Sequence, residues 1–173
     1  TIGVTASIGR VAPDDQAEAY RAWLRALLAP ALHRLGDRKV DGEPERTTAL
    51  RASLFDALAR FGDDQARRDQ AAAHFAALGS DPDAVDADLA DAVVRVVAST
   101  ADEATWDELR RRATAARTAQ DRLRHQGALA DARDPALVLR FCELCFTDEV
   151  RSQDALFLLA RALRNRYAAA DVW

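Results

Sequence analysis

Hydrophobic residues recur at intervals of three and four along most of this chain, which is the spacing of one face of an α-helix. In the first such stretch the apolar face is formed by Tyr20, Trp23, Leu24, Leu27, Leu28, Leu32 and Leu35. Asp14 or Asp15 is predicted to cap its start, Gly36 to end it, and Pro30 to kink it.

The same spacing returns after a loop at residues 36–44. It runs through Leu50, Leu54, Leu58 and Phe61 to Gly62, and then through residues 63–78, which begin with acidic capping residues and close at Gly79. A turn at 80–86 precedes "VVRVV" (93–97), whose valines 93, 96 and 97 fit a helix face and lack a flanking hairpin signal. Later apolar positions are Trp106, Leu109, Leu123, Leu129, Leu137, Phe141, Leu144, Cys145, Leu156, Leu159 and Leu163. The pattern predicts an all-α fold.

Two of these helical stretches repeat one another. Residues 57–75 and 128–146 have equal length, share Ala-Leu-Ala near the start, and end at Phe75 and Phe146. Each carries an Asp at the point where one predicted helix ends and the next begins, Asp63 in the first stretch and Asp134 in the second. A third such change of helix falls at Asp102. This layout predicts an α-solenoid of the armadillo or HEAT sort, built from stacked antiparallel helix pairs with switches near 62–63, 100–102 and 132–134.

Composition narrows the possible functions. The 173 residues carry a net charge of −4, which disfavours a general nucleic-acid or membrane-surface binder. No apolar run approaches the ~20 residues of a membrane span, and the first ten residues do not read as a signal peptide. Met is absent and Lys39 is the only lysine. We therefore expect residues 1–173 to be an excised fragment of a single helical domain from a bacterium, with exposed apolar ends that favour self-association.

Candidate chemistry within the chain is sparse. Cys142 and Cys145 form a C-x-x-C motif. Such a motif binds zinc, acts as a redox pair, or consists simply of two small core residues. The core interpretation is favoured because no second ligand pair exists and the motif lies late in a helix. His33, His74 and His125 share no helical turn and are expected at the surface or at helix edges, so no metal site is predicted. The low cysteine count fits a reducing compartment, and we expect a cytoplasmic protein.

The most basic stretch, residues 107–126, faces either an anionic partner or solvent. Asp107 stands four residues before Arg111, and Glu108 four before Arg112. Such pairs stabilise an exposed helix face by about 0.2–0.5 kcal/mol each. A solvated, charge-balanced face is therefore the preferred interpretation.

The end of the chain resembles a known family. Val150, Arg151, Ser152, Gln153 and Asp154 are followed ten residues after the Asp by Arg164 and Asn165, and eight residues after the Asn by Trp173. This is similar to the C-terminal helical domain of the aminopeptidase N family of zinc metallopeptidases, and most similar to the subfamily of endoplasmic-reticulum and puromycin-sensitive aminopeptidases. Collinear likenesses upstream lie at 25–36, 70–75, 85–98 and 105–109.

The chain departs from the family pattern in two places. Residues 166–172 lack the Pro that the family often has there, and Asp171 and Val172 replace small apolar residues. The family's catalytic motifs, G-x-M-E-N and H-E-x-x-H, are absent from these residues.

The resemblance implies a function for the parent protein. The parent would be a bacterial zinc aminopeptidase that removes N-terminal residues from peptides. This domain would contact the catalytic domain of the same chain and enclose a bowl through which peptides reach the zinc. Arg151, Gln153, Arg164 and Asn165 are the candidate residues of that bowl, and Ser152 is predicted to cap their helix, with Asp154 in its first turn. Two alternatives remain: these residues only join neighbouring helix ends, or the protein is a free-standing helical-repeat scaffold without catalysis.

Overall fold

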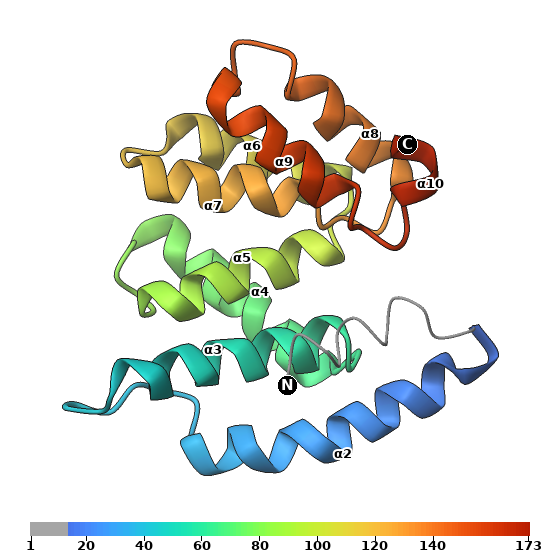
Figure 1. The fold of residues 1–173 in the computed structure, drawn as a ribbon. Helices are drawn as coiled ribbons and strands as arrows, with labels where there is room; N and C mark the ends of the chain where they lie inside the picture. The colour runs from blue at the N-terminus through green and yellow to red at the C-terminus, as the bar shows by residue number, and fades with distance from the viewer. Residues whose placement is uncertain (1–13) are drawn as a thin grey trace. The chain divides into compact units, whose positions relative to one another are not determined.

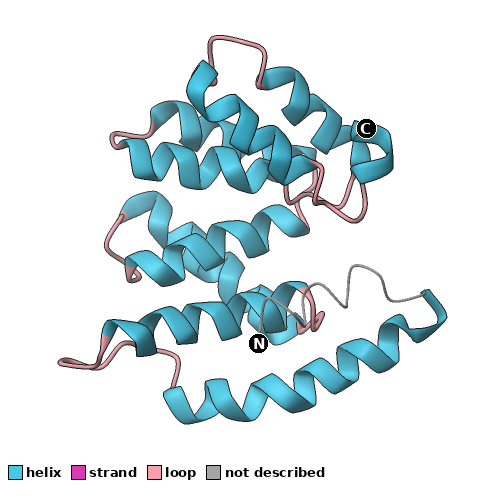
Figure 2. Ribbon diagram, in the orientation of Figure 1, coloured by secondary structure: helices cyan, strands magenta, loops and turns pink. Residues whose placement is uncertain are grey.

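The computed structural model describes residues 14–173, and every regular element in that range is a helix (Figures 1 and 2). The prediction of an all-α fold is confirmed; the solenoid stacking stays a prediction. The chain divides into two compact units, one up to Val96 and one from Val97 onward, with the boundary inside a helix. Each unit is described by itself below.

The first unit contains a short 3₁₀ turn and the helices that follow it. The 3₁₀ turn η1 spans Asp14–Gln16, and the helices are α2 (Ala17–Leu35), α3 (Glu45–Arg60), α4 (Gln65–Ser80) and α5 (Ala87–Ser99), which runs across the unit boundary. α2 packs on α3, and α3 packs on α4. The buried faces contribute Leu24, Leu28 and Leu32 from α2 and Leu54, Phe55 and Leu58 from α3.

The second unit is centred on a helical hairpin. α6 (Glu103–Ala115) and α7 (Ala119–Leu129) lie side by side, joined by three residues (Figure 1). α8 (Pro135–Leu144) and α9 (Ser152–Ala162) contact α7 and each other, and the short α10 (Ala169–Val172) contacts α8. Trp106, Leu109, Val138 and Phe141 are fully shielded from solvent at the centre of this unit.

Three helices that start at the predicted changes of helix have a side-chain cap. Asp64 accepts a hydrogen bond from the backbone N–H of Arg67, Asp102 from that of Thr105, and Asp134 from that of Ala136. The helix changes near 62–63, 100–102 and 132–134 are therefore confirmed. At the first of them Asp64 is the cap, while Asp63 occupies the left-handed region with φ of 56°.

The predicted ends of α2 and α4 need correction. Asp14 and Asp15 lie in η1 and do not cap α2, whose N-cap Gln16 makes no side-chain cap bond. Gly36 does end α2: with φ of 72°, its N–H donates to the carbonyls of His33 and Leu32. α4 continues through Gly79 to Ser80, because a glycine in the last turn weakens a helix without stopping it.

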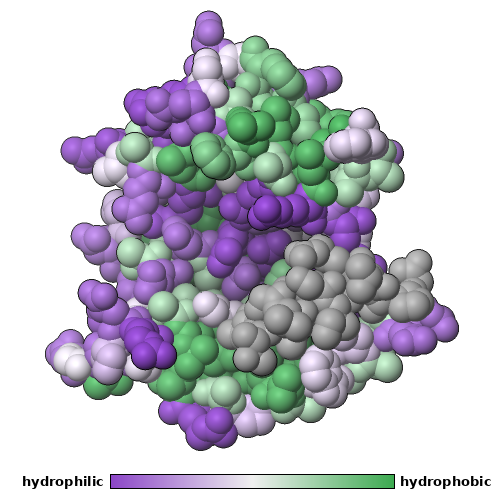
Figure 3. All heavy atoms as spheres, in the orientation of Figure 1, coloured by the Kyte–Doolittle hydropathy of each residue, from purple (hydrophilic) through white to green (hydrophobic). Residues whose placement is uncertain are grey.

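Several apolar positions lie on the opposite side from the one predicted. α9 buries Leu158 and Ala162, whereas the predicted Leu156 is 73% exposed and the predicted Leu163 39%. Phe75 is buried but its repeat counterpart Phe146 is 80% exposed, so the two repeats do not bury equivalent residues. Figure 3 shows the hydrophobic surface that results over α9.

A buried ion pair fixes the loop between α2 and α3. The Arg51 guanidinium donates to Glu43 Oε1 at 2.6 Å and Oε2 at 2.7 Å, and to the carbonyls of Gly36 at 3.0 Å and Leu35 at 3.2 Å. Thr48 Oγ1 donates to the same carboxylate at 2.7 Å. One side chain on α3 thus joins the end of α2 to the far end of the 36–44 loop.

We predict that this ion pair makes stability depend on acid pH. The hydrogen bonds from Arg51 and Thr48 lower the pKa of Glu43 from 4.5 to about 2. Because the folded-state pKa is depressed, the carboxylate's contribution is complete above pH ~4.5 and is lost as pH falls toward 2. In urea unfolding, the free energies of unfolding of wild type and Glu43→Gln should differ clearly at pH 6 and become equal near pH 2. The exposed variant Glu45→Gln is the control, and a difference between wild type and Glu43→Gln that does not change with pH would contradict the assignment.

Candidate functional site

The candidate residues lie at the two ends of α9. Arg151 is the residue before the helix and Gln153 lies in its first turn, whereas Arg164 and Asn165 follow its last residues. Ser152 is the first helical residue rather than the N-cap, which corrects the predicted cap; Asp154 does lie in the first turn. At 1.5 Å per residue the two ends are roughly 18–20 Å apart, so the structure does not gather the four residues at one point.

Asn165 is held by the turn between α7 and α8. Its Nδ2 donates to the carbonyl oxygens of Ala130 at 2.8 Å and Ala132 at 2.6 Å, and its Oδ1 accepts from the N–H of Tyr167 at 2.9 Å. Ala130 and Ala132 are almost completely buried, so their carbonyl groups need a donor within the protein. These bonds explain Asn165 without a ligand.

Arg161 reinforces the same contact one helical turn earlier. Its guanidinium forms an ion pair with Asp131, which lies between the two alanines that Asn165 holds. The guanidinium passes over Gly127 of α7, where a Cβ would lie 2.9 Å from Arg161 Nη1. We call Asp131, Arg161 and Asn165, with the carbonyls of Ala130 and Ala132, the turn clamp.

The other three candidates are open to solvent. Arg151, Gln153 and Arg164 are exposed, and their side chains make no hydrogen bond or ion pair with residues 14–173. The turn clamp holds the helix, and thus the backbone from which these side chains extend. They are therefore available to a partner or substrate in a way that Asn165 is not.

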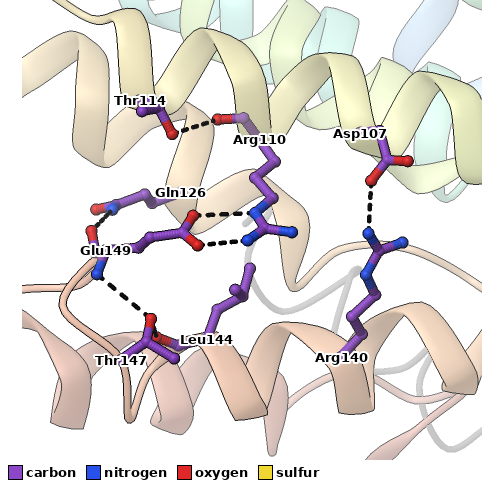
Figure 4. A network of polar contacts seen from close by, with 8 residues as sticks. All are labelled: Asp107, Arg110, Thr114, Gln126, Arg140, Leu144, Thr147 and Glu149. Atoms are coloured by element: carbon purple, nitrogen blue, oxygen red, sulfur yellow. Dashed lines mark hydrogen bonds and ion pairs between the residues drawn. The ribbon is translucent and has the colours of Figure 1, made fainter.

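A second polar cluster fixes the loop that leads into α9 (Figure 4). Arg110 of α6 forms a two-pronged ion pair with Glu149, and its hydrogen bonds lower the pKa of that carboxyl. The buried Gln126 of α7 donates to the backbone carbonyl of Glu149 at 2.8 Å. Both contacts fix the chain two residues before Arg151.

The basic stretch at 107–126 is charge-balanced, but only one of its two predicted pairs forms. Glu108 accepts from Arg112 as predicted and also from Arg111, both at 2.7 Å, and these bonds lower its pKa to about 2. Asp107 instead accepts from Arg140 of α8 at 2.8 Å. Arg140 also lies 4.6 Å from the centre of the Trp106 ring, a cation–π distance.

The thiols and imidazoles show no catalytic arrangement. Burial raises the pKa of Cys142, and burial together with Cys142 raises that of Cys145 to about 11, so both stay protonated thiols at neutral pH. His125 is buried, which corrects its predicted surface position; burial lowers its pKa, and its Nδ1 lies 2.9 Å from the carbonyl of Asp121. Residues 14–173 hold no group of three or more His, Cys, Asp or Glu able to bind a metal ion.

Sequence analysis named Asn165 and allowed that it only joins neighbouring helix ends, but it missed the partners of Asn165 and the two ion pairs that position α9. Arg110 and Glu149 are 39 residues apart, Arg161 and Asp131 are 30 apart, and Asn165 and Ala130 are 35 apart. A periodicity of three to four residues carries no information about such partners. Gln126 carries no local signal either, because its burial is visible only in the folded structure.

Comparison with known proteins gives the arrangement a family context. The model of the ERAP1-like C-terminal domain matches residues 2–173. Aminopeptidase M1-C of rice (Oryza sativa subsp. japonica) is 29% identical over 181 residues, which cover 98% of this chain but 20% of the rice protein. In the described part of the chain, no helix has both the length and the apolar character needed to cross a membrane. The chain belongs to the family of ERAP1-like C-terminal domains.

Proposed function

We propose that this chain is the C-terminal domain of a bacterial, cytoplasmic zinc aminopeptidase that removes N-terminal residues from peptides. The family match over residues 2–173 and the likeness to a rice protein named as an aminopeptidase support the peptidase parent. The chain spans about a fifth of that relative's length, so the activity belongs to the parent as a whole. The nearly exclusive use of Arg supports a bacterial origin, and the low cysteine count supports the cytoplasm.

The zinc is proposed for another part of the parent. The described residues offer no set of three or more metal-binding side chains. They do not fit a zinc site, so no catalytic step is assigned to them. The role proposed for this domain is to enclose the bowl through which peptides reach the zinc, and to bind the peptide there.

The observation that carries this role is the difference between Asn165 and the other three candidate residues. Asn165 is fully occupied by the turn clamp, while Arg151, Gln153 and Arg164 are exposed on the helix that the clamp holds. A guanidinium can bind a carboxylate through two parallel hydrogen bonds, and a glutamine amide can pair with a peptide group. We propose that these three side chains line the bowl and contact the peptide backbone or its C-terminal carboxylate.

A scaffold without catalysis remains the second candidate. The observation that favours it is the apolar surface of α9, since exposed apolar patches often mark protein-binding sites. Reading the gene upstream of Thr1 separates the two: an H-E-x-x-H motif there supports the peptidase, and a nearby start codon supports the scaffold.

The first prediction concerns peptide binding by the full-length parent. Arg151→Ala and Arg164→Ala should raise KM for long peptides about tenfold or less while hardly affecting a single-residue chromogenic substrate, which is too short to reach them. Steady-state kinetics on both substrates tests this. Equal losses on the two substrates, with a lower melting temperature, would assign the arginines a structural role instead.

The second prediction separates Asn165 from its neighbour. Asn165→Ala leaves two buried carbonyls without a donor and should lower the free energy of unfolding by about 1–3 kcal/mol. The matched variant Arg164→Ala removes an exposed side chain and should change it by less than about 0.5 kcal/mol. Urea denaturation of the 173-residue chain measures both, and similar values for the two variants would remove the distinction on which the proposal depends.

The third prediction is that the 173-residue chain alone neither binds zinc stoichiometrically nor cleaves aminoacyl substrates. Isothermal titration with zinc and an assay with a chromogenic substrate test it. One tight zinc per chain, lost in Cys142→Ser, would show that a metal site had been overlooked.

A further inference from the structure

Every polar group of Glu149 has a hydrogen-bond partner, and the partners come from different parts of the second unit (Figure 4). Its carboxylate accepts from Arg110 Nε of α6 at 2.9 Å and also from Arg110 Nη2. Its carbonyl oxygen accepts from Gln126 Nε2 of α7 at 2.8 Å, and its N–H donates to Thr147 Oγ1 at 3.3 Å. Thr147 Oγ1 in turn donates at 2.9 Å to the carbonyl oxygen of Leu144, the last residue of α8. Three helices thus hold the loop before α9 at one residue.

α9 begins without the side-chain cap that the helices packed around it have. α6, α7 and α8 start at Asp102, Thr118 and Asp134, each of which accepts a hydrogen bond from a backbone N–H of its own first turn. The N-cap of α9 is Arg151, whose side chain makes no such bond. An uncapped helix start opens more readily, because its first N–H groups have no partner within the helix. The contacts of Glu149, two residues earlier, hold the start of α9 in place of a cap.

Two of the three exposed candidate residues lie at this start. Arg151 immediately precedes α9 and Gln153 is in its first turn, whereas Arg164 lies at the far end, beside the turn clamp. The carbonyl oxygen of Arg151 accepts from the N–H groups of Asp154 at 2.8 Å and Ala155 at 3.1 Å. These two bonds break if the start of the helix opens. A side chain that extends from such an opening backbone loses more conformational entropy when it binds a ligand.

We infer that Arg110 is a positioning residue for peptide binding: it touches no peptide itself and acts through Glu149, which holds the backbone of Arg151 and Gln153. This inference rests on the proposed function, in which those two side chains contact the peptide. The side chains of Arg110 and Glu149 are 33% and 37% exposed, so solvent screening keeps the effect moderate. Loss of Arg110 should therefore weaken the binding of long peptides about threefold.

A cycle of variants in the full-length parent tests the inference. Arg110→Ala should raise KM for long peptides about threefold and leave a single-residue chromogenic substrate unaffected. Added to Arg151→Ala and Gln153→Ala together, it should cause no further rise, because no side chain is left for it to position. Added to Arg164→Ala, it should cause its full rise. A further rise in the first combination would show that Arg110 contacts the peptide or that its loss disturbs the whole domain, and either would overturn the inference.

Exchanging the charges tests whether the ion pair is the cause. Arg110→Glu and Glu149→Arg should each raise KM for long peptides, and the double variant should recover most of the loss because the opposite charges face each other again. Arg111→Ala is the matched control, since Arg111 is the next residue on α6 and pairs with Glu108. It should leave KM unchanged. A double variant no better than its two single variants, or an equal effect of Arg111→Ala, would contradict the inference.

Amide hydrogen exchange gives a second readout that needs no substrate. In the 173-residue chain, Arg110→Ala should speed the exchange of the Asp154 and Ala155 amides about threefold or more, because their bonds to the carbonyl of Arg151 open more often. The amide of Leu163, which donates to Leu159 at the other end of α9, should exchange as in wild type. Unchanged exchange at Asp154 and Ala155, or equal acceleration at both ends of α9, would count against the inference.

Arg151→Ala alone separates a failure of this inference from a failure of the proposed function. If this variant leaves KM for long peptides unchanged, the proposed function is wrong and the inference falls with it. If it raises that KM while Arg110→Ala does not, the proposed function stands and only the inference is overturned.

Discussion

The second unit depends on how the buried turn between α7 and α8 satisfies its backbone. The chain must leave α7 at Leu129 and enter α8 at Pro135, and the alanines between them are almost completely buried. Buried carbonyls without a hydrogen-bond partner are costly, so this turn needs donors from elsewhere in the protein. Asn165 supplies both of them, and Arg161 pairs with Asp131 between them. The position of α9, and of everything that it exposes, follows from this turn clamp.

The same solution recurs at two other loops. Arg51 joins the two ends of the 36–44 loop in the first unit, and Arg110 with Gln126 holds the loop before α9 in the second. In each case one or two side chains on a helix satisfy the irregular backbone and charges of a loop. The loops are thereby ordered without regular structure of their own, which holds the backbone from which an exposed side chain such as Arg151 extends.

Several of the helix boundaries were predictable because their signals are local, whereas the break at residues 116–118 between α6 and α7 was not predicted. Apolar spacing and the caps Asp64, Asp102 and Asp134 specify where α4, α6 and α8 begin, and Gly36 specifies where α2 ends. The buried face of α9 was not predictable, since Leu156, Phe157, Leu158 and Leu159 are all apolar and no single face stands out. The burial of His125 depends on neighbours from other helices, which the sequence pattern does not reveal.

The candidate residues could be named from the sequence, but their roles could not. A family likeness placed Arg151, Gln153, Arg164 and Asn165 together, and only the hydrogen bonds of Asn165 separate it from the three exposed side chains. Its bonding partners are the backbone carbonyls of Ala130 and Ala132, 35 and 33 residues away, and a backbone carbonyl carries no signal in the sequence.

The central claim is that the turn clamp positions α9, and a double-mutant cycle between Asp131 and Arg161 tests it most directly. Unfolding free energies of wild type, Asp131→Ala, Arg161→Met and the double variant give the coupling between the two side chains. Because Arg161 is about one-third exposed, solvent screening limits the expected coupling to about 1 kcal/mol. A coupling near that value is the predicted result. A coupling indistinguishable from zero would show that the Asp131–Arg161 ion pair does not hold α9 and would contradict the account.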